Sequence, residues 1–151
     1  MKRLIPLLLI FLFLPLCCLS ETTDSDNDPI ILYSDGNLIL KYDSIDIYGS
    51  TLYINCIAEN NTDHDLKVRF SRCVLNGWDI VDSSLFDGHI FVKNHSNKRT
   101  RFDFDKGSFM AGISDPEEAE TLDYTLHITH EGESTVYYDS PEPVVVSLIK
   151  H

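Results

Sequence analysis

Hydrophobic and polar residues alternate with a period of two through most of the chain. The segments 51–59, 66–71 and 122–129 each place apolar residues at every second position, with polar or charged residues between them. Successive side chains of a strand point to opposite faces, so this pattern is typical of half-buried β-strands. Shorter apolar runs at 30–33, 38–42, 135–138 and 144–149 fit further strands. No long helical period accompanies them.

Turn-forming residues separate these segments. Asp35-Gly36, Tyr48-Gly49-Ser50 and Asn76-Gly77 are hairpin signals, and residues 106–113 have room for one helical turn. The polar loop 60–65 is predicted to join its neighbouring strands as an antiparallel hairpin, apolar inside and charged outside. Seven or eight short strands at regular spacing predict an all-β fold, an antiparallel immunoglobulin-like sandwich over residues 30–149.

The N-terminus has the pattern of an export signal. Lys2 and Arg3 precede an unbroken apolar run from Leu4 to Leu16, which is too short to span the ~30 Å core of a bilayer. Small residues at Cys18 and Ser20 fit a cut before Glu21. We therefore expect residues 1–20 to be a signal peptide and the mature protein to be extracytoplasmic.

Cys17 and Cys18 raise a second outcome, lipid attachment. A bacterial lipoprotein signal places a small residue directly before the modified cysteine. Cys17 follows bulky Leu16, while Cys18 follows Cys17 but has Pro15 three positions upstream. Both fits are imperfect, so free secretion is preferred and a lipid anchor on the outer face of the membrane stays open.

The mature chain is acidic. The whole chain has a formal charge of −12, which becomes more negative when Lys2 and Arg3 are removed. Such a surface repels phosphate backbones, so neither nucleic acid nor anionic lipid is an expected partner. Residues 21–29 are polar and acidic and are predicted to form a disordered tether. Their D-x-D-x-D spacing suggests an EF-hand loop, but Pro29 replaces the required glycine and excludes it.

Four short stretches carry a resemblance to a known family. Residues 58–66 (AENNTDHDL), 74–78 (VLNGW), 112–115 (GISD) and 122–128 (LDYTLHI) resemble, in this order, the motifs of a family of small bacterial extracytoplasmic immunoglobulin-like domains. The resemblance covers about residues 30–149. It implies a β-sandwich found in secreted proteins and lipoproteins, without an assigned activity, because its motifs are those of turns rather than of catalysis.

The two mature cysteines, Cys56 and Cys73, invite a disulfide in an exported protein. The predicted hairpin would pair Cys56 near Arg69 and leave Cys73 more than ~10 Å along the ladder, beyond the reach of a bridge. Two buried thiols are therefore preferred. A strand that crosses between sheets near Ser71 would bring the two cysteines together, so the disulfide stays a minority hypothesis.

Catalytic and metal-binding patterns are absent from the sequence. His127 and His130 are three residues apart, which on a strand points them to opposite faces, and no zinc spacing occurs. No nucleophile elbow, glycine-rich phosphate loop or basic aromatic stripe is present. We expect neither enzyme activity nor a cofactor. The alternative is a hydrolase-type enzyme with a loop-built site, for which the candidate residues are His89, His95, Asp103 and Asp105.

Binding residues are the remaining lead. Trp78 follows a turn, and Tyr137 and Tyr138 place one ring on each face of a strand, so these aromatics are candidates for contact with a protein or a surface glycan. For Trp78 the preferred interpretation is packing over the open end of the sandwich. We predict a non-catalytic binding or spacer module at the cell surface. An inhibitor or chaperone of another exported protein is a further alternative, and an exposed apolar edge strand at Val144–Ile149 would be its mark.

Overall fold

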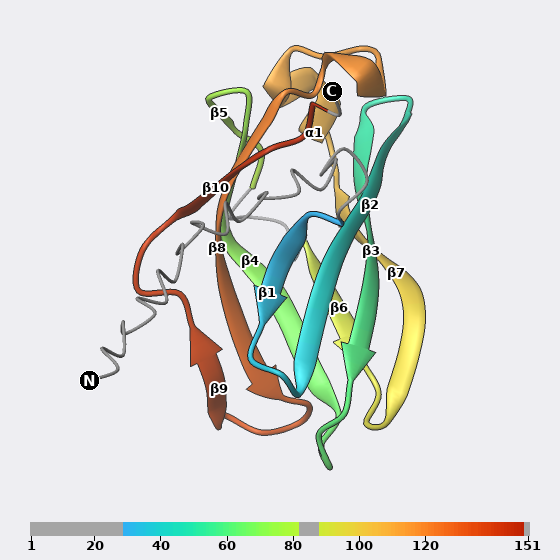
Figure 1. Ribbon diagram of the computed structural model, residues 1–151. Coiled ribbons are helices and arrows are strands. Elements are labelled where there is room, and N and C mark those ends of the chain that lie inside the picture. Colours follow the sequence, from blue (N-terminus) through green and yellow to red (C-terminus); the bar gives the residue numbers. More distant parts are fainter. Residues whose placement is uncertain (1–28, 82–87, 150–151) are drawn as a thin grey trace, which may run out of the picture.

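Two antiparallel sheets face each other in the computed structural model, which describes residues 29–81 and 88–149 (Figure 1). The first sheet has the order β1-β2-β3-β7, with bounds Ile31–Ser34, Leu38–Tyr48, Thr51–Asn60 and Ser96–Phe104. The second sheet is built on the central pair β4 and β8, Leu66–Leu75 and Thr121–His130. The chain is an all-β, immunoglobulin-like sandwich, as the alternating pattern predicts.

The second sheet has interrupted outer strands. On one side of β4 lie β5, Trp78–Asp79, and β6, His89–Val92. On the other side of β8 lie β9, Val136–Asp139, and β10, Val144–Ser147. The described residues thus contain ten strands, where the sequence predicts seven or eight. The apolar segments found in the sequence correspond to β1–β4 and β8–β10, so β5, β6 and β7 are the strands beyond them.

The core consists of the inward side chains of both sheets. In β3 and β8 every second residue is buried, as the period of two predicts. Phe70 on β4 meets Phe102 on β7 with ring centroids 4.5 Å apart. The buried hydroxyl of Tyr124 donates to the Leu32 carbonyl at 2.6 Å, so β8 is joined to β1 in the opposite sheet. Burial of these large apolar side chains supplies the main stabilisation of the fold.

Loop 60–65 crosses between the sheets, and the predicted hairpin of β3 with β4 is wrong. β3 pairs with β2 and β7, while β4 pairs with β5, β6 and β8. Period-two alternation describes each strand correctly, but it is the same whether the next strand lies beside the first or across the core. The side chains of the loop, rather than its length, distinguish the two cases.

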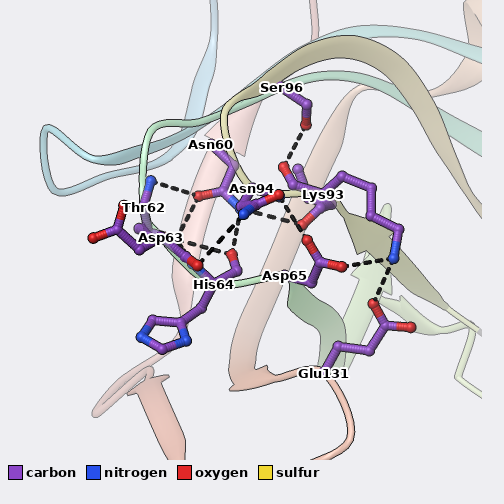
Figure 2. Close-up of polar contacts among 10 residues, drawn as sticks. Asn60, Thr62, Asp63, His64, Asp65, Lys93, Asn94, Ser96 and Glu131 are labelled. Atoms are coloured by element: carbon purple, nitrogen blue, oxygen red, sulfur yellow. Dashed lines mark hydrogen bonds and ion pairs between the residues drawn. The ribbon is translucent and has the colours of Figure 1, made fainter.

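Asn60 holds this crossing in place (Figure 2). Its side chain is fully buried, and its amide donates to the carbonyls of His64 at 2.9 Å and Val92 at 3.1 Å. Its side-chain oxygen accepts from the Thr62 backbone N–H at 2.9 Å and the Thr62 hydroxyl at 2.7 Å. A buried amide with all these partners is stable where an unpaired one would be costly. Asn60 therefore couples the loop to the end of β6.

The Asp65 carboxylate fastens the same end of the sandwich (Figure 2). It accepts from the Lys93 ammonium at 2.6 Å and from the Asn94 backbone N–H at 2.8 Å. Lys93 also reaches Glu131 at 3.2 Å. These contacts join the crossing loop to the β6–β7 and β8–β9 turns. The Lys93 hydrogen bond, with that of Asn94, holds the pKa of Asp65 below its usual value.

Candidate functional site

Among the strands of residues 29–81 and 88–149, none pairs with the outer edge of β10. β10 follows Pro141 and Pro143 and lies at the end of its sheet, with β8 on its inner side (Figure 1, red). Val144, Val145, Val146 and Ser147 pair with Tyr124, Asp123, Leu122 and Thr121 in antiparallel register. Every β10 residue therefore has one neighbour in β8, and we can determine which backbone groups this pairing uses.

Two hydrogen bonds, one on each side of these four pairs, show which residues of β8 bond to β9 and β10. The Leu148 N–H donates to the Glu120 carbonyl at 2.8 Å, and the Ser140 N–H donates to the Leu126 carbonyl at 2.9 Å. Even-numbered residues of β8 thus direct their backbone groups toward β9 and β10. Residues of an antiparallel pair alternate between hydrogen-bonded and non-hydrogen-bonded positions. Val145 and Ser147 consequently point their N–H and C=O groups outward, and no backbone bond to either is seen in the described parts of the chain.

The side chains of this edge are uncharged from Val144 to Ile149, and all of them except that of Ser147 are apolar. Val145 is 67% exposed and Ile149 is 50% exposed, whereas Leu148 is buried against the core. Proteins usually protect an open edge with charged residues, proline or a bulge. The opposite edge strand β7 has such protection in Lys98, Arg99 and Arg101. The β10 edge has none within 144–149, and the exposed apolar edge strand expected there is confirmed.

An acidic loop adjoins the C-terminal end of β10. The short 3-10 helix η2, Pro116–Glu118, begins at Asp115 with a capping box, as expected for Asp115 before Pro116. The Asn76 side chain fixes the loop from the β4–β5 turn. Its amide donates to the Glu118 carbonyl at 2.6 Å, and its oxygen accepts from the Glu120 N–H at 2.9 Å. Glu120 therefore connects the turn on one side with Leu148 on the other.

The aromatic side chains of Trp78 and Phe109 are exposed to solvent. Trp78 is 63% exposed, so the preferred interpretation, that it packs over the open end of the sandwich, is wrong. It follows a turn in which Asn76 and Gly77 both have positive φ, 51° and 85°, a geometry that directs the chain back along β4. The five-residue helix α1, Gly107–Ala111, packs against β3 and β5 and carries the 81% exposed Phe109. Phe109 has no signal in the sequence, because one helical turn is too short to show a period.

Tyr137 and Tyr138, the two tyrosines predicted as binding residues, contact residues of the first sheet and its β1–β2 turn. Tyr138 packs its ring on Tyr33 with centroids 4.6 Å apart. The Tyr137 hydroxyl donates to Asp35 at 2.5 Å, and Asp35 also accepts from the backbone N–H groups of Asn37 and Leu38. Burial raises the pKa of Asp35, but these hydrogen bonds outweigh it and hold the pKa below the usual value. Both tyrosines are half-buried, and both contribute to structure.

The two cysteines lie in different sheets, Cys56 on β3 and Cys73 on β4. Both are free and fully buried. The register that would separate them along one ladder does not exist, because β3 and β4 do not pair. Burial, with a smaller contribution from the Asp43 charge, raises the pKa of the Cys56 thiol to about 12. Burial also raises the pKa of Cys73, and both groups are therefore protonated and unreactive near neutral pH.

The other candidates fall into separate contacts or outside the described residues. His95 pairs with Asp63 at 3.1 Å, and Asp103 pairs with Arg101 at 3.2 Å, so two members of the hypothetical enzyme site have different partners. A shallow hollow on β7 is lined by Asn55, Arg99, Thr100, Arg101 and Asp103. Arg99 and Arg101 are already bound there to Asp43 and Asp103.

Metal and membrane features were also sought. In residues 29–81 and 88–149, no three His, Cys, Asp or Glu side chains are arranged to hold a metal ion. Nor does that part of the chain contain a helix with the length and hydropathy to cross a membrane. The predicted signal peptide, the tether up to residue 28, Cys17 and Cys18 lie outside the described residues.

Comparisons with known proteins do not assign the chain to a family. No family model matches the chain, and no curated protein matches it. A crystal structure of the yeast GGA1 GAE domain in a P21 crystal form is similar to 81% of this chain and 100% of its own, at 12% identity and a TM-score of 0.37. The bacterial family suggested by the turn motifs is not confirmed by these comparisons.

Proposed function

We propose that this chain is a non-catalytic, extracytoplasmic binding module that takes up an extended segment of another protein along the outer edge of β10. The observation that supports it is the outward direction of the Val145 and Ser147 backbone groups, on an uncharged edge. An added strand would satisfy these groups with hydrogen bonds that are independent of the partner's side chains. The predicted signal peptide would bring the module to the compartment where such partners are exposed.

Affinity along such an edge has two sources. The N–H and C=O groups of Val145 and Ser147 would provide up to four backbone hydrogen bonds, each worth about 0.5–1.5 kcal/mol net. The exposed Val145 side chain, opposite Asp123 in the ladder, adds an apolar contact on the outer face. Selection between partners would come from the surfaces that flank the edge.

A selection experiment tests this function. A phage library of random twelve-residue peptides is panned against residues 21–151, and the enriched peptides are measured against Val145→Pro and Val145→Thr. Proline removes the outward N–H without removing a bond to β8, and threonine keeps the N–H and the branched side chain. We expect binding to be lost in the first variant and retained in the second. Failure to enrich any peptide, or equal binding to both variants, contradicts the proposal.

A further inference from the structure

We infer that the segment bound at β10 is basic, with lysine or arginine side chains that meet the acidic loop 115–120. This inference rests on the proposed function, because it assigns the chemistry of the partner at the same edge. It is carried by the position of that loop at the C-terminal end of an open strand, and by the absence of lysine and arginine from residues 107–149, which form both.

Charge is distributed unevenly along the chain. From Gly107 to Ile149 the sequence contains no lysine or arginine. The same stretch contains nine carboxylates: Asp115, Glu117, Glu118, Glu120, Asp123, Glu131, Glu133, Asp139 and Glu142. The elements formed by this stretch include β8, β9, β10 and η2. Asp123 and Glu131 are paired with Arg72 and Lys93 from outside the stretch. The stretch is nevertheless acidic, and such a charge attracts a cationic ligand.

The acidic loop is fixed in position rather than free to move away. Glu120 donates its N–H to Asn76 and accepts from the Leu148 N–H, so the loop is bonded directly to the end of β10. Glu118 is used in the capping box, where it accepts from the Ser114 and Asp115 N–H groups. The side chains of Glu117 and Glu120 are exposed and make no ion pair with the described residues. They are the carboxylates available to a partner.

Further groups favour a cation at the same end. The Asp123 carboxylate lies opposite Val145. Its Oδ2 binds Arg72 at 3.2 Å, while its Oδ1 is buried and has no hydrogen-bond partner among the described residues. Trp78 follows the turn whose Asn76 side chain anchors the loop, and it exposes its ring to solvent on β5, beyond β8 and β4 from β10. An exposed indole attracts ammonium and guanidinium groups through its π face.

The same charges disfavour other occupants. A second copy that paired its own β10 with this one would bring together two copies of the acidic stretch 107–149, and like charges across an interface are costly. The chain's own segment 21–29 contains four acidic residues and no basic residue, so it is repelled as well. A basic segment of a different protein is the occupant that the charges fit.

Two synthetic peptides test this inference. One is a nine-residue peptide of alternating lysine and valine, and the other has glutamate in place of lysine. Binding to residues 21–151 is followed by fluorescence anisotropy at about 50 mM and about 300 mM salt. We expect the lysine peptide to bind more tightly, with an affinity that falls as salt rises. The double variant Glu117→Gln/Glu120→Gln should weaken it roughly threefold to tenfold, as expected for two exposed ion pairs.

The matched control is Glu59→Gln/Asp103→Asn, which makes the same change in net charge on the other sheet and should leave the affinity unchanged.

Equal binding of the two peptides, or no binding of either, overturns the inference. So does equal binding of the lysine peptide to wild type and Val145→Pro, which would indicate adsorption away from the edge. Self-association of the wild type in sedimentation, lost in Val145→Pro, would make a second copy the occupant and overturn it too. Peptides enriched by phage selection that depend on the β10 edge but lack basic residues would refute the charge inference while leaving the proposed function intact.

Discussion

The backbone N–H of Leu148 donates to the carbonyl oxygen of Glu120 at 2.8 Å. This bond does two things at once. It sets the alternation of the β8–β10 ladder, so that Val145 and Ser147 face outward. It also holds the acidic loop against the end of the open edge. The binding surface proposed above depends on both consequences.

Proline substitutions test the alternation within β10. Val145→Pro removes an N–H that no described group uses, so we expect the free energy of unfolding to stay close to that of wild type. Val146→Pro removes a donor directed at Leu122 and should cost about 2 kcal/mol or more, from the lost bond and the clash of the ring. Urea unfolding followed by Trp78 fluorescence measures both. Equal destabilisation would mean that the alternation is assigned incorrectly.

The bond between Tyr137 and Asp35 joins residues from opposite sheets. Burial, together with the hydrogen bond to Asp35, raises the pKa of Tyr137 to about 12, so its hydroxyl remains a donor at neutral pH. Tyr137→Phe should lower the free energy of unfolding by about 1 kcal/mol. Tyr138→Phe is the control, since the Tyr138 ring packs on Tyr33 and its hydroxyl lies outside this network. A larger loss in Tyr138→Phe than in Tyr137→Phe would contradict the assignment.

Acid should weaken the crossing between the sheets. The hydrogen bonds from Lys93 and Asn94 lower the pKa of Asp65 in the folded state. The stability that they contribute is present above the unfolded-state pKa of about 4, and it is lost as pH falls through the folded-state value. Asp35 contributes in the same direction and the same window.

Two variants separate the contribution of Asp65 to the pH dependence of stability from that of Asp35. Urea midpoints of wild type, Lys93→Met and Asp65→Asn are compared between about pH 6 and about pH 2. Both variants should lose less stability over this range than wild type, because the charge-assisted bond is already absent. An unchanged pH dependence in Asp65→Asn would show that Asp65 contributes no linkage.

The buried thiols should not react with alkylating reagents in the native protein. Since burial raises the pKa of both Cys56 and Cys73, neither should react with iodoacetamide within about three hours near pH 7.5. Both should react once guanidinium unfolds residues 21–151, which contain no other cysteine, and mass spectrometry should then count two added groups. A protein that adds none after unfolding without reductant contains the disulfide instead.

The pattern of the sequence predicts individual strands better than their neighbours. Residues 51–59 and 122–129 alternate clearly because each strand buries one face, and that local property is visible in the chain. Whether loop 60–65 turns within a sheet or crosses to the other depends on the burial of Asn60 and its bond to Val92, 32 residues away. No short-range signal contains that information, so the sequence predicts a hairpin where the structure has a crossing between the sheets.

The candidate site was predictable in part for the same reason. Val144–Ile149 is recognisable as a mostly apolar strand, and its lack of charge indicates an edge that is open to pairing with another chain. Its partner β8 and the adjoining acidic loop come from residues about 20 to 30 positions away, and only the folded register brings Leu148 to Glu120. The exposure of Trp78 also depends on long-range packing, since a turn signal is compatible with a covered ring or an open one.

Amide hydrogen exchange in β10 tests the central claim most directly. In the free domain we expect Val144, Val146 and Leu148 to be protected by their bonds to β8, whereas Val145 and Ser147 exchange at nearly unprotected rates. A bound peptide should slow exchange at Val145 and Ser147 and leave the other three unchanged. Equal protection of all five amides in the free domain would show that the edge is already covered and would contradict the account.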